Sequence, residues 1–258
     1  MIEQLLIEVC VDSVDSALAA ERGGAQRVEL CSDLLEGGIT PSLGVLETVR
    51  SRISIALHSI IRPRSGDFCY SDNEFEIMCR DIEFAKRAGA DGVALGILDL
   101  AGRVDIERTR QLVELARPLS VTFHRAFDMS ADLNRSLEDL SQTGADRILT
   151  SGGQADCAQG VETISNLVKS ARGRITIMAG GGITSANVAH IIERSHVSEV
   201  HVGLGTPVKS PVLHRTPRVF LGKAHGGEYE RTEVLEKNVR ELKRAISCGR
   251  AERCALKD

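Results

Sequence analysis

Short apolar runs rich in β-branched residues alternate with amphipathic segments along this chain, and no other feature constrains its fold as strongly. A run of this kind is typical of a buried strand, and an amphipathic segment is typical of a helix that covers one face of a sheet. Because a helical segment separates each strand from the next, the pattern favours a parallel sheet with right-handed crossovers. The runs lie at residues 5–11, 26–31, 53–60, 91–96, 119–124, 146–150, 174–179 and 198–202.

A short repeat precedes alternate strands. In each copy a glycine can end a helix in the left-handed conformation, and the apolar residues that follow begin a strand. A repeated βα unit predicts a single closed (β/α)8 TIM barrel, an α/β fold, over residues 1–258, with an open doubly wound sheet as the alternative. The copies begin at Gly24, Gly89 and Gly144, before the second, fourth and sixth runs.

The region after the eighth run has a different character. Residues 206–231 contain several prolines and lack a periodic pattern, so we expect an irregular segment there that acts as a lid or an interface. Apolar residues at helical spacing then predict a final outer helix over residues 232–247. These residues are Leu235, Val239, Leu242 and Ile246.

Charge and composition exclude several classes of protein. Lys+Arg (32) and Asp+Glu (36) nearly cancel, so nucleic acid is not expected as a partner. No apolar run approaches the ~18 residues of a membrane span, and no secretion signal is evident, so no membrane is expected. The 7 cysteines are scattered without CxxC spacing, which argues against a disulfide framework or a structural zinc site. We therefore expect reduced thiols and a cytoplasmic location.

Glycines follow the seventh and eighth runs, where barrels of this kind often bind phosphate. Backbone N–H groups of glycine can approach an anion closely, and a helix expected to begin near Thr184 adds its positive end. We predict a phosphate or carboxylate site there. The alternative is that these glycines only turn the chain. They are Gly180, Gly181 and Gly182, and then Gly203.

The first and second runs share the pattern Glu-x-Cys. Residues two apart on a strand share a face, and neighbouring strands lie ~4.8 Å apart, so Cys10 and Cys31 are expected to meet near the barrel mouth. Glu8 and Glu29 are expected to point inward, away from the outer helices. Two thiolates are soft ligands that select Cu(I). The alternative is a pair of small buried apolar residues.

A long loop follows the third run and carries two arginines. Arg62 and Arg64 flank a proline that stiffens the chain, so both guanidinium groups are expected to face one way and bind an anion. Long ordered loops are often functional. A solvated basic loop is the alternative.

Polar residues at the ends of other strands complete a candidate catalytic set. His124 ends the fifth run and is expected as a general acid or base, oriented by Asp128. Glu8 and Glu29 are expected to move protons with them. No lysine lies in a predicted strand, which disfavours a Schiff-base mechanism. The candidate anion-binding residues also include Arg125, Ser151 and His201.

Several of these motifs together resemble the CutC family of copper homeostasis proteins. The stretches that carry the resemblance are residues 27–31, 36–44, 61–64, 66–71, 121–128 and 149–152. The resemblance implies a TIM barrel, in agreement with the strand pattern, and a role in copper handling. It also implies that Cys10 and Cys31 are the copper ligands.

Two functions therefore stay open. The first is a cytosolic copper-binding protein with Cu(I) as its ligand and a homo-oligomer as its assembly. The second is an enzyme of unknown reaction that acts on a small phosphorylated or carboxylated substrate through Glu and His acid–base chemistry. A scaffold is disfavoured because it has little use for converging buried charge.

Overall fold

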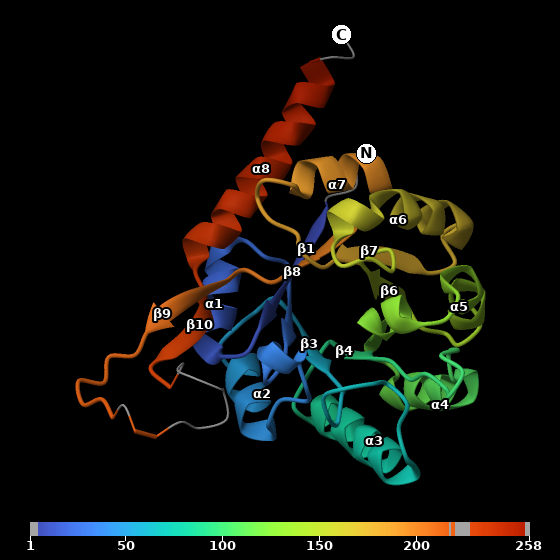
Figure 1. Cartoon of the computed structure of the whole chain (residues 1–258), viewed down its shortest axis with the longest axis horizontal. Coiled ribbons are helices and arrows are strands. Elements are labelled where there is room, and N and C mark those ends of the chain that lie inside the picture. Colours follow the sequence, from blue (N-terminus) through green and yellow to red (C-terminus); the bar gives the residue numbers. More distant parts are fainter. Residues whose placement is uncertain (1–4, 217, 220–227, 256–258) are drawn as a thin grey trace.

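The computed structural model describes residues 5–216, 218–219 and 228–255, and eight strands close into a parallel barrel (Figure 1). Each barrel strand pairs with the next in sequence, and β8 pairs with β1 to close the ring. The predicted (β/α)8 TIM barrel is therefore confirmed. The strands are β1 (Leu6–Val11), β2 (Arg27–Leu30), β3 (Ala56–Ile60), β4 (Gly92–Leu95), β5 (Ser120–Phe123), β6 (Arg147–Thr150), β7 (Thr176–Gly180) and β8 (Glu199–Val202).

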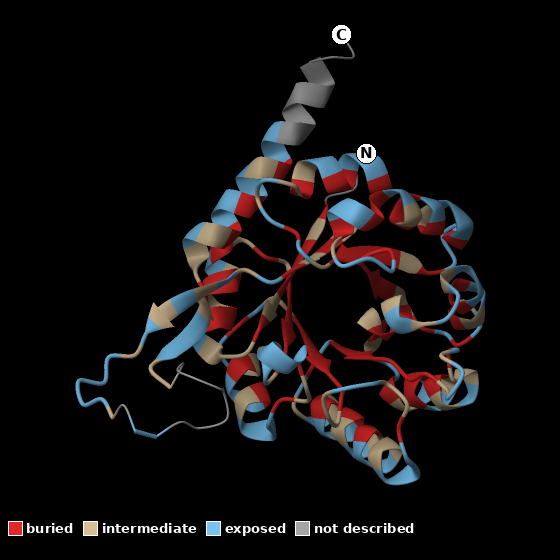
Figure 2. Ribbon diagram, viewed as in Figure 1, coloured by how far each residue is buried: buried red, intermediate tan, exposed pale blue. Residues whose placement is uncertain are grey.

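Helices surround the barrel, and their buried faces point toward the strands (Figure 2). Within the described ranges, no helix has both the length and the apolar character needed to cross a membrane. The α-helices are α1 (Val14–Gly23), α2 (Leu43–Arg50), α3 (Asp72–Arg87), α4 (Ile106–Ala116), α5 (Leu133–Leu140), α6 (Cys157–Ala171), α7 (Val188–Ser195) and α8 (Glu236–Ala255). Two short 3-10 helices are η1 (Leu34–Glu36) and η2 (Arg125–Met129).

The glycines of the short repeat adopt the left-handed conformation that the sequence predicts. The φ angle is 93° at Gly24, 81° at Gly89 and 84° at Gly144. Gly24 ends α1 by donating its N–H to the carbonyls of Ala20 and Glu21. Residues with a Cβ rarely adopt this conformation, so the repeat reflects one backbone requirement met at three equivalent places.

Apolar side chains fill the space between the strands and the helices, whereas charged side chains lie inside the barrel. Val9, Val28 and Val200 alternate with the inward-facing residues of their strands and are fully buried between strands and helices. Inside the barrel, Glu8 and Glu29 are also buried, with 1% and 4% of their surface exposed. Buried charges are unfavourable unless they are paired, so the barrel interior requires the ion pairs described below.

The structure differs from the prediction after β8. The segment 206–231, predicted as irregular, begins and ends in strands: β9 (Gly205–Lys209) and β10 (Glu230–Val234) pair as an antiparallel hairpin that projects from the barrel (Figure 1). Both strands are short and mostly polar, a pattern that sequence alone cannot separate from a loop. Residues 217 and 220–227 of this segment lie outside the described residues.

The final helix also starts later than predicted. Because residues 230–234 pair as a strand, α8 begins at Glu236 rather than at residue 232. Val239, Leu242 and Ile246 are buried as the helical spacing predicts, on the side where α8 contacts α1 and α7. The last helix thus completes the outer ring.

Candidate functional site

Two cysteines from neighbouring strands meet at the carboxyl end of the barrel. Cys10 lies near the end of β1 and Cys31 directly follows β2, and their Sγ atoms are 3.5 Å apart. The parallel register places Cys10 opposite Glu29. Glu29 Oε2 lies 3.4 Å from Cys31 Sγ and 3.7 Å from Cys10 Sγ. The predicted convergence of the two cysteines is confirmed, and Glu29 joins them as a third potential metal ligand.

A histidine links the thiols to a second carboxylate. His201 of β8 lies beside Glu8 of β1 because these two strands close the barrel. His201 Nδ1 is 2.7 Å from Glu8 Oε1, and His201 Nε2 is 3.9 Å from Glu29 Oε2. Possible ligand atoms of these three residues all lie within 4.8 Å of one another. The sequence assigns His201 to anion binding, whereas the structure places it between two carboxylates.

Arg27 is a buried residue of this site that the sequence analysis does not single out. Its side chain is 3% exposed, and its guanidinium pairs with Glu8 and with Glu199, where Nη2 is 2.5 Å from Oε2. Arg147 Nε binds the same Glu199 oxygen at 3.0 Å. One signal for Arg27 is present in the sequence: it precedes Glu29 by two residues and therefore shares its inward face.

The two inward-facing glutamates have opposite protonation states. Burial would raise the pKa of Glu8, but the charge of Arg27, together with His201 and His58, lowers that pKa well below its ordinary value. For Glu29, burial is the largest effect and raises the pKa to about 8, although His201 opposes it. Glu8 is therefore ionised at neutral pH, and Glu29 is mostly protonated.

The two thiols are also inequivalent. Hydrogen bonding with Cys31 is the largest influence on Cys10, and with the help of His201 it overcomes burial and lowers the pKa of Cys10 to about 6. The same hydrogen bond, with burial, raises the pKa of Cys31 well above its ordinary value. Burial opposes a charge on His201, yet Glu29, Cys10 and Glu8 raise its pKa well above the usual range. The arrangement stabilises a Cys10 thiolate between a thiol and an imidazolium.

A cavity of about 110 Å³ opens beside the thiols, and we call it the mouth cavity. Ligand sites of TIM barrels form at this end of the fold, where the loops that follow the strands come together. The two candidate metal-ligand groups therefore share one space with cationic and aromatic side chains. The residues that line the mouth cavity include Cys10, Glu29, Arg62, Phe68, His124 and His201.

His124 does not pair with Asp128 as predicted. His124 Nδ1 instead accepts a hydrogen bond from the backbone N–H of Ala126, at 3.2 Å. Burial, with the charge of Arg62, lowers the pKa of His124 to about 3. A neutral imidazole with so low a pKa is a weak base, which argues against the predicted general acid–base role of His124.

Asp128 organises the loop after β6 rather than a histidine. The turn of η2 directs its carboxylate toward Thr150 Oγ1, at 2.5 Å, and toward the backbone N–H of Ser151, at 3.0 Å. Asp128 Oδ2 also accepts a hydrogen bond from Arg125 Nε at 2.8 Å, and Arg125 Nη2 donates to Ser151 Oγ at 2.7 Å. Arg125 and Ser151, both predicted to bind an anion, are thus held together by Asp128.

Arg62 and Arg64 do not face one way as predicted. Arg62 is 5% exposed and lines the mouth cavity, and its Nη atoms donate to three backbone carbonyls. Arg64 instead ties its loop to α3 through Glu74, with Nε 2.5 Å from Oε1, and pairs with Asp67 at 3.1 Å. The proline does not hold the two side chains parallel because each guanidinium finds different partners.

Local conformation and packing explain the glycines after β7. The φ angle is 119° at Gly181 and 66° at Gly182. A Cβ on Gly181 would lie 3.3 Å from Arg125 Cζ, and a Cβ on Gly182 would lie 2.7 Å from Asp156 Cβ. The helix expected near Thr184 begins instead at Val188. The glycines therefore serve the turn and its packing, and the anion cradle stays a prediction.

The other two candidate glycines have different surroundings. A Cβ on Gly180 would lie 2.4 Å from Leu149 Cδ1 and 3.0 Å from His201 Cβ, so glycine allows these side chains to pack inside the barrel. Around Gly203, no heavy atom of the described residues lies within 4 Å of the Cβ position, apart from its own chain neighbours. Gly203 thus leaves open space after β8.

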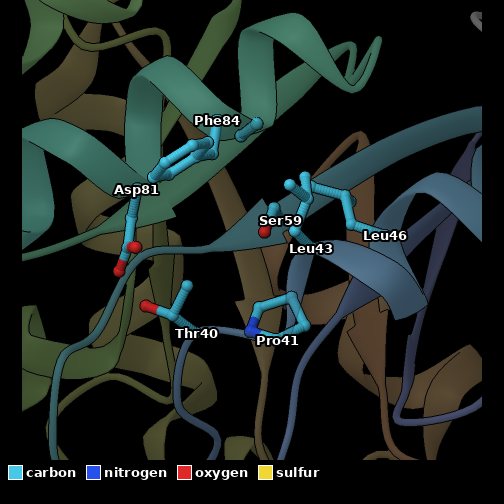
Figure 3. Close-up of a pocket in the computed structure, with 8 residues that line it drawn as sticks. Thr40, Pro41, Leu43, Leu46, Ser59, Asp81 and Phe84 are labelled. Carbon is cyan, nitrogen blue, oxygen red and sulfur yellow. The ribbon is translucent and has the colours of Figure 1, made fainter.

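Another cavity, of about 100 Å³, lies outside the barrel between α2 and α3 (Figure 3). Leu43 and Leu46 of α2 lie on one side of it, and Asp81 and Phe84 of α3 on the other. Burial raises the pKa of Asp81. Its lining contains none of the candidate catalytic, anion-binding or metal-binding residues, so the mouth cavity is the candidate site.

Comparisons with known proteins agree with this fold. A profile of the CutC family matches residues 5–206. The chain belongs to the CutC family. A CutC family protein of Chromobacterium violaceum is 44% identical over 241 residues, which cover 93% of this chain and 98% of that protein. The copper homeostasis protein cutC homolog of Mus musculus is 50% identical over 217 residues, which cover 84% of this chain and 80% of the mouse protein.

A crystal structure of CutC from Streptococcus agalactiae superposes with a TM-score of 0.72 at 34% identity, covering 77% of this chain and 98% of the other. The CutC match spans every barrel strand, both cysteines and the mouth cavity, and it ends within β9. The strand β10 and the helix α8 lie beyond it. The candidate site is therefore contained in the part of the chain that defines its family membership.

Proposed function

We propose that this CutC family protein acts in copper homeostasis by binding Cu(I) through Cys10 and Cys31. The observation that carries the proposal is the distance of 3.5 Å between the two sulfur atoms at the barrel mouth. The name of the Mus musculus relative, a copper homeostasis protein, supports the same role. Soft thiolate ligands favour Cu(I) over hard cations.

The geometry of the thiols suits one small ion. Metal–sulfur bonds of ~2.3 Å, as in zinc thiolate sites, reach a single ion from two sulfurs at this separation. Cys10 is partly exposed, so an ion has access from the mouth. His201 and the hydrogen bond from Cys31 lower the pKa of Cys10 to about 6, which favours the thiolate that a metal requires.

We also propose that the protein works in a reducing compartment such as the cytosol. Cys10 and Cys31 are both free although their sulfurs are close. Such a pair is retained as thiols where glutathione and thioredoxin keep cysteines reduced. Reduced cysteines can also ionise to the thiolates that bind Cu(I).

A Cu(I) titration against a competing chelator tests the proposal. We expect the native protein to bind one Cu(I) per chain, and the double variant Cys10→Ser, Cys31→Ser to lose this binding. The matched control is Cys69→Ser, Cys79→Ser, which removes two other free cysteines. An unchanged affinity in the first double variant would overturn the proposal.

A second function, acid–base catalysis on a small carboxylated or phosphorylated substrate, is favoured by one observation. Glu29, which is mostly protonated, lies beside His201 in the mouth cavity, so a proton donor faces a ligand space. Small molecules that copurify with the protein would be identified by mass spectrometry and incubated with native protein and with Glu29→Gln. Equal turnover by both proteins would remove Glu29 from such a mechanism.

A further inference from the structure

Two buried N–H groups of the mouth cavity have no hydrogen-bond partner among the described residues. They are His124 Nε2 and Arg62 Nε. Both side chains are 5% exposed, and both line the cavity. An unpaired buried donor is unfavourable, and most such groups in proteins are satisfied. Two of them at one cavity therefore point to a ligand that accepts hydrogen bonds.

The tautomer of His124 follows from its contacts. Its Nδ1 accepts a hydrogen bond from the backbone N–H of Ala126, so the proton of the neutral ring is on Nε2. Burial and the nearby charge of Arg62 lower the pKa of His124 to about 3, so the ring is neutral at physiological pH. His124 thus presents a neutral N–H donor.

Arg62 presents a positive charge that its own loop does not neutralise. Its Nη1 donates to the carbonyls of Glu36 and Gly38 at 2.8 and 2.9 Å, and its Nη2 donates to the carbonyl of Gly66 at 2.8 Å. These partners are uncharged backbone groups, and they hold the guanidinium in one orientation. The remaining Nε–H has no well-formed hydrogen bond, although the buried hydroxyl of Tyr70, which is also unpaired, interacts with the Arg62 side chain.

Part of the cavity wall around these donors is apolar. Phe68 packs on both side chains: its ring centroid is 5.1 Å from that of His124 and 4.9 Å from Arg62 Cζ. Ile60 and Leu149 also line the cavity. A ligand for this space therefore combines an anionic acceptor group with a short hydrocarbon part.

We infer that the mouth cavity binds a small aliphatic carboxylate whose oxygens accept hydrogen bonds from His124 Nε2 and Arg62 Nε. A carboxylate has one negative charge to match the guanidinium of Arg62, and two oxygens to match the two donors. The volume of about 110 Å³ exceeds the roughly 10–15 Å³ that one water needs, so a ligand of several non-hydrogen atoms fits. The carboxylate is held by His124 and Arg62 and not by the thiols, so this inference can be tested independently of Cu(I) binding.

The first test uses the whole chain of 258 residues, freed of metal with a chelator, and three probes at equal ionic strength. Sodium butyrate is the carboxylate, butyramide is its uncharged isostere, and inorganic phosphate is the other anion. We expect butyrate to raise the melting temperature with saturation at millimolar concentration, and the other two to have much smaller effects. Equal responses to butyrate and butyramide would overturn the inference, and a preference for phosphate would overturn the choice of carboxylate.

The second test removes one donor. His124→Asn keeps a side-chain oxygen that can accept from Ala126 N–H but lacks the Nε2–H group. We expect butyrate to bind about tenfold more weakly or worse, because a hydrogen bond to a charged group is lost. The matched control is His190→Asn, on the exposed surface of α7, with unchanged affinity. Full affinity in the His124 variant would contradict the assignment.

A third measurement does not depend on the variant folding. In native protein labelled with nitrogen-15 at histidine, butyrate should shift the Nε2 resonance of His124, whereas butyramide should not. No shift at a butyrate concentration that saturates the melting response would place the carboxylate elsewhere. Failure of this site would leave the Cu(I) proposal intact, because that proposal is tested by the cysteine variants.

Discussion

Arg27 shows how a single residue can control the state of the candidate site. Its guanidinium lies between Glu8 and Glu199 inside the barrel, and it keeps Glu8 ionised. Glu8 in turn binds His201, which borders the thiols. A buried pair of charges is costly to break because the remaining partner has no water to solvate it. Arg27 therefore influences the pKa of Cys10 indirectly, through Glu8 and His201.

The substitution Arg27→Met tests this dependence. It removes the positive charge that pairs with the buried carboxylates of Glu8 and Glu199. We therefore expect the free energy of unfolding to fall by about 3–5 kcal/mol. Urea denaturation measures it. The control is Arg22→Met, which removes a largely exposed arginine paired with Glu236 and should change stability by less than about 1 kcal/mol. Similar small losses in both variants would contradict the role given to Arg27.

The pH dependence of stability reports on His124. Its pKa is lowered by burial to about 3 from an ordinary 6.5, so the unfolded chain binds the proton more tightly and stability falls as pH falls below about 6.5. Between pH 7 and pH 5 this residue should cost about 2 kcal/mol. His124→Asn lacks the titrating group. Between pH 7 and pH 5, the free energy of unfolding should therefore fall by about 2 kcal/mol more in the native protein than in the variant. A difference that is constant with pH would show that His124 does not titrate in this way.

At the scale of elements, the loops after the strands are positioned by close backbone contact. Gly160 of α6 approaches the loop after β6 so closely that a Cβ would lie 1.8 Å from the carbonyl oxygen of Ser151. The same loop carries the hydrogen bonds of Asp128. The packing of α6 and the hydrogen bonds of Asp128 thus both fix the position of the loop after β6.

Two glycine-to-alanine substitutions separate packing from helix propensity. Gly160→Ala forces α6 away from Ser151, and we expect it to lower the free energy of unfolding by about 1–3 kcal/mol or more. For Gly44→Ala in α2, the new Cβ meets no atom of the described residues within 4 Å apart from its own helix backbone and chain neighbours, and the substitution should raise stability by about 0.5–1 kcal/mol. Thermal unfolding of the two variants measures both effects. Stabilisation by both substitutions would mean that the contact in α6 relaxes freely.

At the scale of the whole molecule, barrel closure brings the first and last barrel strands, β1 and β8, together at the candidate site. Pairing of β1 with β8 joins residues far apart in the chain, and Glu8 and His201 meet through it. A ligand held by such residues binds the folded chain more tightly than the unfolded one. Binding at the barrel mouth is therefore linked to global stability.

Cu(I) should consequently stabilise the folded protein. At a free Cu(I) concentration one hundred times the Kd, the free energy of unfolding should rise by up to about 2.7 kcal/mol, and by less where cysteines of the unfolded chain also bind Cu(I). Differential scanning calorimetry with and without a Cu(I) chelator measures the change as a rise in Tm. The variant Cys10→Ser, Cys31→Ser should show no such rise. Equal stabilisation of the variant would place the copper elsewhere.

Much of the fold was accessible from local patterns. The alternation of apolar runs and amphipathic segments predicts the barrel, and the repeated glycine predicts three left-handed helix ends. The hairpin of β9 and β10 was missed because its strands are short, polar and paired only with each other. Local patterns identify elements that bury one face, and they fail for elements that do not.

The sequence by itself determined that Cys10 and Cys31 meet, because residue alternation and the pairing of consecutive parallel strands are short-range rules. Only the tertiary structure decided their electrostatic surroundings. Arg27 reaches Glu199, a residue 172 positions away, and burial raises the pKa of Glu29 to about 8. Protonation states depend on burial and on distances between charges, and both exist only once the barrel has closed.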